Sequence, residues 1–161
     1  MAGERPGERR ARILVVSDGV ASGTREDLSG PALRDRLAEA GFAIEGIETT
    51  PDGIEPVAAA LTRLTAGFAG LVVTTGGTGF GPRDRTPEGT GAVIDREAPG
   101  LAEAMRLANP LGRLSRATAG TAGTALVVNL PGSPTGAVEC IEAVLDVLPH
   151  ALDLLAGGHP H

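Results

Sequence analysis

The stretch Leu71–Thr90, which reads LVVTTGGTGFGPRDRTPEGT, constrains the fold more than any other part of this chain. It begins with an apolar, β-branched run that predicts a buried strand over Leu71–Thr75. A loop follows, with glycine at positions 76, 77, 79 and 81, and Thr86-Pro87-Glu88 then indicates the start of a helix. A strand that opens into a glycine-rich loop before a helix is typical of α/β proteins that hold phosphate-bearing ligands.

The rest of the chain alternates between strand-like and helix-like patterns. The order β-α-β-α-β-α-α-β-β-α predicts an α/β fold, with a mostly parallel sheet, helices on both faces and an antiparallel edge from the late pair of strands. Strands are expected over residues 12–16, 42–48, 71–75, 114–120 and 124–130. Helices are expected to begin near residues 29, 54, 86, 99 and 136, the third ending near 96 and the last near 148.

Length and composition favour one domain. A chain of 161 residues can bury a sizeable core, and its only aromatic residues are three Phe, so Val, Leu, Ile and Ala must fill that core. Such side chains suit helices packed tightly on a parallel sheet. We expect a single domain over residues 11–156, with an N-terminal tail over 1–10 and a C-terminal tail over 157–161.

The charged residues exclude some binding modes. The net charge of −6 argues against nucleic acid as the main partner, because phosphate neutralisation needs a basic face. All fourteen basic residues are Arg, so there is no lysine for a Walker-type P-loop. Any positive contact to a phosphate must therefore come from Arg, a backbone amide or a metal.

The sequence also indicates a compartment. Cys140 is the only cysteine, so it forms no intrachain disulfide, and on its helical pattern it is expected to be a small buried residue. No apolar run approaches the roughly 20 residues that a membrane span requires. Met1–Arg10 has no apolar segment of the kind found in a signal peptide. We expect a cytoplasmic protein with no membrane partner.

Four small, polar loops follow predicted strands: Ser17–Asp27, Thr50–Gly53, Thr75–Thr86 and Asn129–Ser133. The carboxyl ends of parallel strands line the ligand crevice of an open sheet, so these loops are expected to converge. Backbone amides between Gly76 and Gly81 would form an anion-binding nest, with the hydroxyls of Thr75 and Thr78 as additional donors. This loop is not the dinucleotide fingerprint, because Pro82 stands where the third glycine would be required. A tight turn that only reverses the chain is the alternative.

Asp52 and Asp84 are the candidate metal ligands. Two carboxylates beside an anion-binding loop are what metal-assisted phosphoryl or nucleotidyl transfer needs. For Asp52 the alternative is ordinary turn chemistry, and for Asp84 it is capping of a helix. Asp18 is expected either to bind a ligand hydroxyl or metal, or to cap a turn. Asn129–Ser133 is either a second small-residue cradle or the place where Ser133 caps the helix that begins at Pro134.

Several motifs together resemble the molybdopterin-binding domain family, and most closely its single-domain molybdenum cofactor biosynthesis proteins of the MogA/MoaB type. They are Thr74–Gly79 (TTGGTG), Arg83-Asp84-x-Thr86-Pro87-Glu88 and Asn129–Pro134 (NLPGSP). Val16-Ser17-Asp18, Arg96-Glu97-x-Pro99-Gly100 and Leu114-Ser115-Arg116 also fit the pattern. The match covers roughly residues 12 to 155. Position 135 departs from it, since Thr135 stands where many relatives carry a basic residue, and the Pro99–Ser115 segment is shorter than in some members.

The resemblance implies a three-layer α/β/α domain, assembled as a homotrimer, that transfers AMP from ATP to the terminal phosphate of molybdopterin and releases pyrophosphate. It implies Mg²⁺ or another divalent metal as cofactor, and a molybdenum-insertion protein as a possible partner. Asp52 and Asp84 would be catalytic and bind the metal. The implied substrate-binding residues are Ser17, Asp18, Thr75, Gly76, Gly77, Thr78, Gly79, Ser115, Asn129, Pro131, Gly132 and Ser133.

Two other functions stay open at this point. The first is a non-catalytic binding protein for molybdopterin or its adenylated form, which would have no need of both Asp52 and Asp84. The second is an unrelated enzyme that acts on a sugar phosphate or nucleotide on a doubly wound sheet.

Overall fold

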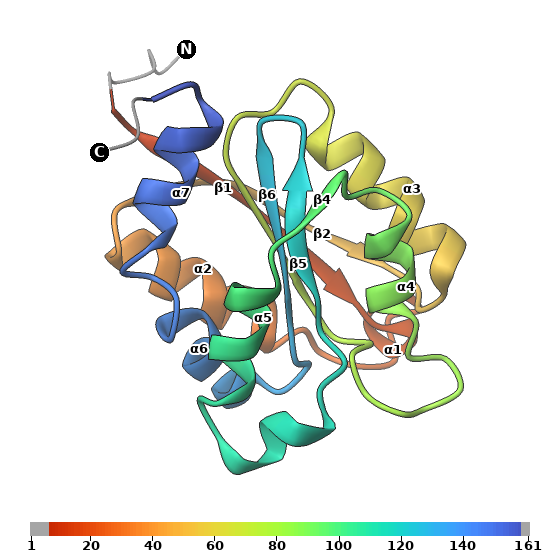
Figure 1. The fold of residues 1–161 in the computed structure, drawn as a ribbon. Coiled ribbons are helices and arrows are strands. Elements are labelled where there is room, and N and C mark those ends of the chain that lie inside the picture. Colours follow the sequence, from red (N-terminus) through yellow and green to blue (C-terminus); the bar gives the residue numbers. More distant parts are fainter. Residues whose placement is uncertain (1–6, 159–161) are drawn as a thin grey trace.

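The computed structural model describes residues 7–158. It contains one six-stranded sheet with the strand order β2-β1-β3-β6-β5-β4 (Figure 1). The strands are β1 (Arg9–Val16), β2 (Phe42–Thr50), β3 (Leu71–Thr75), β4 (Arg96–Glu97), β5 (Ala119–Ala122) and β6 (Ala125–Leu130). The helices are α1 (Asp18–Ala21), α2 (Ser29–Glu39), α3 (Ile54–Thr65), α4 (Thr86–Gly91), α5 (Pro99–Arg106), α6 (Pro134–Glu142) and α7 (Leu148–Leu155), with a 3₁₀ helix η1 (Pro110–Leu114).

The sheet is mostly parallel, as predicted. The pairs β1–β2, β1–β3 and β3–β6 are parallel, whereas β5 runs antiparallel to both β6 and β4. The tight turn between β5 and β6 explains this change of direction, since Gly123 there has a φ of +60°. The late strand pair therefore forms the antiparallel edge that its sequence pattern indicated.

Two hydrophobic clusters cover the two faces of the sheet. Alternate residues of a strand point to opposite faces, so Ile13 and Val15 join one cluster and Leu14 and Val16 the other. The first cluster packs against α2, α5, α6 and α7, and the second against α3 (Figure 1). These three layers match the predicted architecture, and Leu, Val, Ile and Ala dominate both clusters.

The first strand is longer than predicted. It begins at Arg9 rather than Arg12, so the tail expected over residues 1–10 is wrong for its last two residues. Arg9 and Arg10 pair with Phe42 and Ala43 of β2, and acidic partners hold their side chains. The added residues are charged, so the apolar run that predicts the strand is shorter than the strand itself. Residues 1–6 and 159–161 of the expected tails lie outside the described residues.

Two further predictions in the middle of the chain are wrong. The helix that starts at Thr86 ends at Gly91 instead of near Arg96, because the Asp95 amide donates to Thr121 O in β5 and Arg96 pairs with Thr121. The strand expected over 114–120 begins only at Ala119. Pro110 starts η1 ahead of it, and the Asn109 side chain caps this 3₁₀ helix.

The final helices also differ from the prediction. The helix expected over 136–148 is α6, which begins earlier, at Pro134, and ends at Glu142. A short connection separates it from α7, whose eight residues, with Pro149 in the first turn, make about two helical turns. Among the described residues, no helix has the length and apolar character needed to cross a membrane.

Candidate active site

The loops at the carboxyl ends of the parallel strands lie together, as predicted. The Ser17 amide donates to Thr50 O (3.0 Å), and the Gly76 amide donates to Leu130 O (3.0 Å). The Thr75 hydroxyl donates to Pro131 O at 2.7 Å. These bonds connect β1 to β2 and β3 to β6 just beyond the ends of the strands, so the four polar loops share one edge of the sheet.

Glycine is required at two positions where the loop after β3 begins. Gly76 and Gly77 have φ values of +105° and +68°, a region that other residues rarely adopt. A Cβ on Gly76 would lie 2.2 Å from Val16 O, and a Cβ on Gly77 would lie 2.2 Å from Thr86 Oγ1. Thr86 holds this turn, since its hydroxyl donates to Gly76 O (2.8 Å) and its amide donates to Gly77 O (3.0 Å).

Four successive amides of this loop are unpaired. Within residues 7–158, the N–H groups of Gly77, Thr78, Gly79 and Phe80 donate no hydrogen bond. The carbonyls of the same four peptides are bonded to Thr86 or Arg116. Because C=O and N–H point in opposite directions across a trans peptide, each amide faces away from the group that holds its carbonyl. Such a run of amides suits an anion.

Asp52 is held by the turn after β1. Its Oδ2 accepts from the Asp18 amide (2.9 Å), and Asp18 Oδ1 accepts from the Asp52 amide (3.1 Å). Arg83 donates to both carboxylate oxygens of Asp18 (3.0 Å each) and to Asp52 O (3.1 Å). Asp52 Oδ1 accepts no hydrogen bond from the described residues, and it lies 3.1 Å from the point where a Gly77 Cβ would be.

Asp84 lies at the other end of the glycine loop. Its Oδ2 accepts from the Gly81 amide (2.9 Å), and its own amide donates to Gly81 O (3.0 Å). Its Oδ1 accepts no hydrogen bond within the described part of the chain. Each of the two aspartates therefore presents one oxygen to which no residue of 7–158 donates.

The electrostatics of the two turns differ. Burial raises the pKa of Asp52, and the nearby charges of Asp18 and Asp84 raise this pKa further. The hydrogen bond from Arg83 lowers the pKa of Asp18. Asp18 is thus neutralised by a guanidinium, whereas Asp52 lies where negative charge is unfavourable and a cation would relieve it.

These residues fit Mg²⁺ as a ligand set. Among the described residues, no group of three or more His, Cys, Asp or Glu forms a metal cage. Mg²⁺ commonly binds to one or two carboxylates and takes its other ligands from water and substrate phosphates. Asp52 Oδ1 and Asp84 Oδ1, on either side of a loop whose amides suit an anion, meet that requirement.

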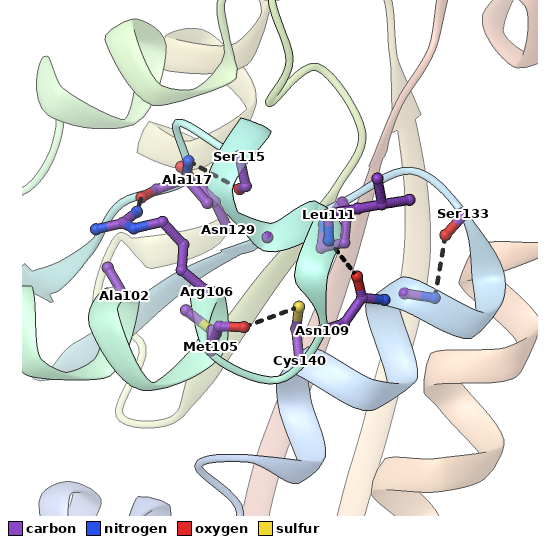
Figure 2. Close-up of a pocket in the computed structure, with 13 residues that line it drawn as sticks. Ala102, Met105, Arg106, Asn109, Leu111, Ser115, Ala117, Asn129, Ser133 and Cys140 are labelled. Atoms are coloured by element: carbon purple, nitrogen blue, oxygen red, sulfur yellow. Dashed lines mark hydrogen bonds between the residues drawn. The ribbon is translucent and has the colours of Figure 1, made fainter.

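A pocket of about 210 Å³ opens beside this loop, between α5, η1, α6 and the end of β6 (Figure 2). It brings together four residues that the sequence predicted for the site, Ser115, Asn129, Pro131 and Ser133. Apolar atoms supply most of its wall. Cys140 also lines it, and its thiol donates to Met105 O (3.4 Å). Burial raises the pKa of the Cys140 thiol, so the thiol stays protonated, in keeping with the structural role expected for it.

A second pocket, of about 350 Å³, lies on the other side of the β6–α6 turn. Ser17, Thr75, Gly132 and Ser133 line it together with the segment 25–29 that precedes and starts α2. Ser133 lines both pockets, so the two spaces meet at this residue. A Cβ on Gly132 would lie 3.4 Å from Gly76 Cα, which shows how closely the turn approaches the glycine loop.

Several predicted site residues have structural partners. The Asn129 amide donates to the hydroxyls of Thr74 (3.0 Å) and Thr90 (2.9 Å), and its oxygen accepts from the Thr118 amide. Ser17 and Ser133 cap α1 and α6. The Ser115 hydroxyl accepts from the Ala117 amide (3.2 Å). Asn129 has no side-chain N–H left for a ligand, whereas each of the three serines keeps its hydroxyl proton.

Three charged residues with a clear place in the site, Arg83, Glu88 and Arg116, are absent from the prediction. Arg83 joins the turns after β1 and β2, while Arg116 binds Glu88 and the glycine loop. All three occur in the motifs that suggested the family, next to residues that were selected. Their role depends on contacts between distant segments, which spacing along one chain does not reveal.

Fold and site together define an α/β domain whose carboxyl sheet edge carries a run of amides suited to an anion, between two aspartates and an apolar pocket. The family model described as a probable molybdopterin binding domain matches residues 12–150. This chain belongs to that family.

Relatives and solved structures agree with this membership. A molybdopterin adenylyltransferase of Helicobacter pylori J99 is 36% identical over 156 residues, covering 91% of this chain and 88% of the relative. The molybdopterin adenylyltransferase of Escherichia coli K12 is 35% identical, covering 92% and 86%. The crystal structure of the molybdopterin biosynthesis enzyme MoaB from Thermus thermophilus has a TM-score of 0.87 and 47% identity, covering 92% of this chain and 97% of that one.

Proposed function

We propose that this protein is a molybdopterin adenylyltransferase, which transfers AMP from ATP to the terminal phosphate of molybdopterin. The observation that carries the proposal is the run of four unpaired amides over Gly77–Phe80, with an unused oxygen of Asp52 and Asp84 near it. The names of the relatives from H. pylori and E. coli support the same reaction.

The chemistry matches this site. A phosphate oxygen of molybdopterin attacks the α-phosphorus of ATP, a new P–O bond forms, and the bond to the bridging oxygen breaks to release pyrophosphate. The attacking oxygen is already anionic, so the protein needs no nucleophile or strong base of its own. The main barrier is the repulsion between two polyanions, which positioning and electrostatic stabilisation overcome.

The chain's own groups divide this work. The amides of Gly77–Phe80 hold the phosphates of ATP, and the apolar pocket with Ser115 at its wall holds molybdopterin. Asp52 Oδ1 and Asp84 Oδ1 would bind Mg²⁺. When bound, Mg²⁺ neutralises phosphate charge and the charge that develops on the leaving pyrophosphate. Arg83 keeps Asp18 neutralised and leaves Asp52 facing the loop.

The test is a transfer assay with purified protein, ATP radiolabelled at its α-phosphate, molybdopterin and Mg²⁺. Adenylyl-molybdopterin should carry the label, and unlabelled pyrophosphate should form in an equal amount. Asp52→Asn and Asp84→Asn should each reduce turnover at least about 100-fold, because each removes a charged metal ligand. Unchanged turnover in both variants would contradict the catalytic assignment. If the wild-type protein binds molybdopterin but transfers no AMP, it is a non-catalytic binding protein.

We also propose that the protein is a single domain that works as a cytoplasmic homotrimer. The trimer and the compartment rest on the resemblance and the composition, and a molybdenum-insertion protein is the proposed recipient of the product.

A further inference from the structure

Arg116 is the most connected side chain around the glycine loop. Its Nε donates to Gly79 O (2.8 Å), its Nη2 donates to Asp84 O (2.6 Å), and its Nη1 donates to both carboxylate oxygens of Glu88 (3.0 and 2.9 Å). Its backbone amide donates to Thr78 O at 2.8 Å. Every nitrogen of this residue is therefore bonded to the loop or to the helix that follows the loop.

These bonds decide where the loop amides point. The carbonyls of Thr78 and Gly79 belong to the same peptides as the N–H groups of Gly79 and Phe80. Holding the two carbonyls toward Arg116 therefore turns these two amides away from it. The bond to Asp84 O fixes the backbone of Asp84, whose carboxylate is already tied to the Gly81 amide.

Glu88 fixes the guanidinium in turn. Both carboxylate oxygens of Glu88 accept from one guanidinium nitrogen, Nη1, and the pair is about one-third exposed on both sides, with relative side-chain exposures of 32% and 31%. The guanidinium lowers the pKa of Glu88, so the pair stays charged at neutral pH. A planar fork bound at all three nitrogens holds one orientation, which an ammonium cannot do.

The position of Arg116 in the chain also matters. Its neighbours Ser115 and Ala117 line the apolar pocket, while its side chain reaches the glycine loop. One short segment thus forms part of the pocket wall and holds the loop that carries the unpaired amides. Because its side chain contacts the loop and not the pocket, its main effect falls on the loop.

We infer that Arg116, oriented by Glu88, is a positioning residue that aligns the Gly79 and Phe80 amides and Asp84 for the triphosphate of ATP. This inference rests on the proposed function. Loss of the guanidinium frees the Gly79–Phe80 peptide and the backbone of Asp84, whereas the bond from the Arg116 backbone amide to Thr78 O remains. Misplacement of reacting groups by about 1 Å can cost about 100-fold in rate.

The experiment compares Arg116→Gln, Arg116→Lys and Glu88→Gln with wild type. We expect kcat/KM for ATP to fall about 100-fold in Arg116→Gln, with little recovery in Arg116→Lys, and about 10-fold in Glu88→Gln. The KM for molybdopterin should change less than about threefold. Arg63→Gln is the matched control, because Arg63, in the last turn of α3, forms an ion pair with Glu48, and this variant should stay within about twofold of wild type.

A second readout does not depend on turnover. Hydrogen exchange should become faster at the bonded amides of Gly81, Asp84 and Thr86 in Arg116→Gln, while the strands keep wild-type protection. Titration of the Mg²⁺-bound form with ATP alone should show weaker binding. If Arg116→Gln does not fold, Glu88→Gln and Arg116→Lys decide the matter by the same measurements.

Two results would overturn the inference. One is kcat/KM for ATP within about threefold of wild type in Arg116→Gln, with unchanged exchange in the loop. The other is an equal loss for both substrates together with faster exchange throughout the protein, which marks a purely structural role. A wild-type protein that transfers no AMP would instead defeat the proposed function, and the exchange and ATP-binding measurements would still test Arg116.

Discussion

The two aspartates of the site are held in different ways. Asp52 is half-buried beside Asp18 and bonded to its amide, whereas Asp84 folds back on the Gly81 amide. Asp18 is among the predicted substrate-binding residues. In the structure its carboxylate accepts hydrogen bonds from Arg83 and from the Asp52 amide. The structure therefore favours Asp18 as a support for Asp52, and a substrate contact by Asp18 stays a prediction.

The first prediction concerns Asp52 and stability. The pKa of this carboxyl is raised above its ordinary value of 3.8, so ionisation of Asp52 destabilises the folded protein at neutral pH. The folded protein gains stability from protonated Asp52. This gain is fully present below pH 3.8 and is lost as the pH rises through the raised folded-state pKa. Asp52→Asn keeps an oxygen for the Asp18 amide and removes the charge.

Metal-free Asp52→Asn should therefore melt about 1–3 °C higher than wild type at pH 7 by calorimetry, although its turnover should be lower. The two proteins should become alike in Tm as the pH falls below 3.8, the ordinary pKa, where the wild-type carboxyl is protonated in both the folded and the unfolded state. A lower Tm for the variant at neutral pH would contradict the assigned cost of the buried charge.

Among the structural elements, the loop between β3 and α4 depends most on glycine. Gly77 and Gly123 have similar φ values, +68° and +60°, but only Gly77 has neighbours that a Cβ would meet. Backbone strain is thus common to both positions, whereas the close approach to Thr86 and Asp52 belongs to Gly77 alone.

The second prediction compares alanine at these two glycines. Gly123→Ala should cost about 1–2 kcal/mol of unfolding free energy from strain and keep full AMP transfer. Gly77→Ala should cost more, because Thr86 must move, and should lose ATP binding as measured by titration calorimetry. Equal effects of the two substitutions on ATP binding would show that the shape of the loop at Gly77 is unimportant.

The third prediction concerns the attachment of α4 by Glu88. The pKa of Glu88 is lowered from 4.5 by Arg116, so its stabilising effect is present above pH 4.5 and is lost as the pH falls through the lower folded-state pKa. Urea unfolding should show Glu88→Gln about 1 kcal/mol less stable than wild type at pH 7, with the gap closing at acidic pH. The more exposed partner of Arg63 gives the control: Glu48→Gln should change stability by less than about 0.5 kcal/mol at either pH. A constant gap for Glu88→Gln across this range would contradict the role of the ion pair.

Sequence patterns predicted the elements whose burial is regular. Leu71–Thr75 is buried throughout, and the strand has the predicted bounds. The patterns failed where a side-chain contact from a distant segment overrides local preference. Residues 115–118 look like a strand, but the Arg116 side chain is bonded to the glycine loop, and the ladder starts only at Ala119. The convergence of the polar loops was predictable from topology. The contacts of Arg83 and Arg116 join segments that are distant along the chain, so local sequence patterns do not reveal them.

At the scale of the molecule, one edge of the sheet carries the whole candidate site, with both pockets meeting at Ser133. On the α5–α7 side, a shallow groove includes Leu101, Leu126 and Ala151, and the exposed Val147 and Leu154 lie along it. This groove shares no residue with the two site pockets. Association of copies through such a surface would leave the loops at the carboxyl edge open.

The fourth prediction is the oligomeric state. Multi-angle light scattering at micromolar concentration should give a mass close to three times 16.2 kDa, in line with the homotrimer that the resemblance implies. A monomer under these conditions would contradict the expected homotrimer. It would not contradict the reaction proposed for the site.

The most direct test of the proposed site is a crystal structure with Mg²⁺ and a non-hydrolysable ATP analogue. We predict phosphate oxygens within hydrogen-bond distance of the Gly77–Phe80 amides, and Mg²⁺ bound by Asp52 Oδ1 and Asp84 Oδ1. A triphosphate bound elsewhere, with these amides unpaired and no metal at either aspartate, would contradict the assignment.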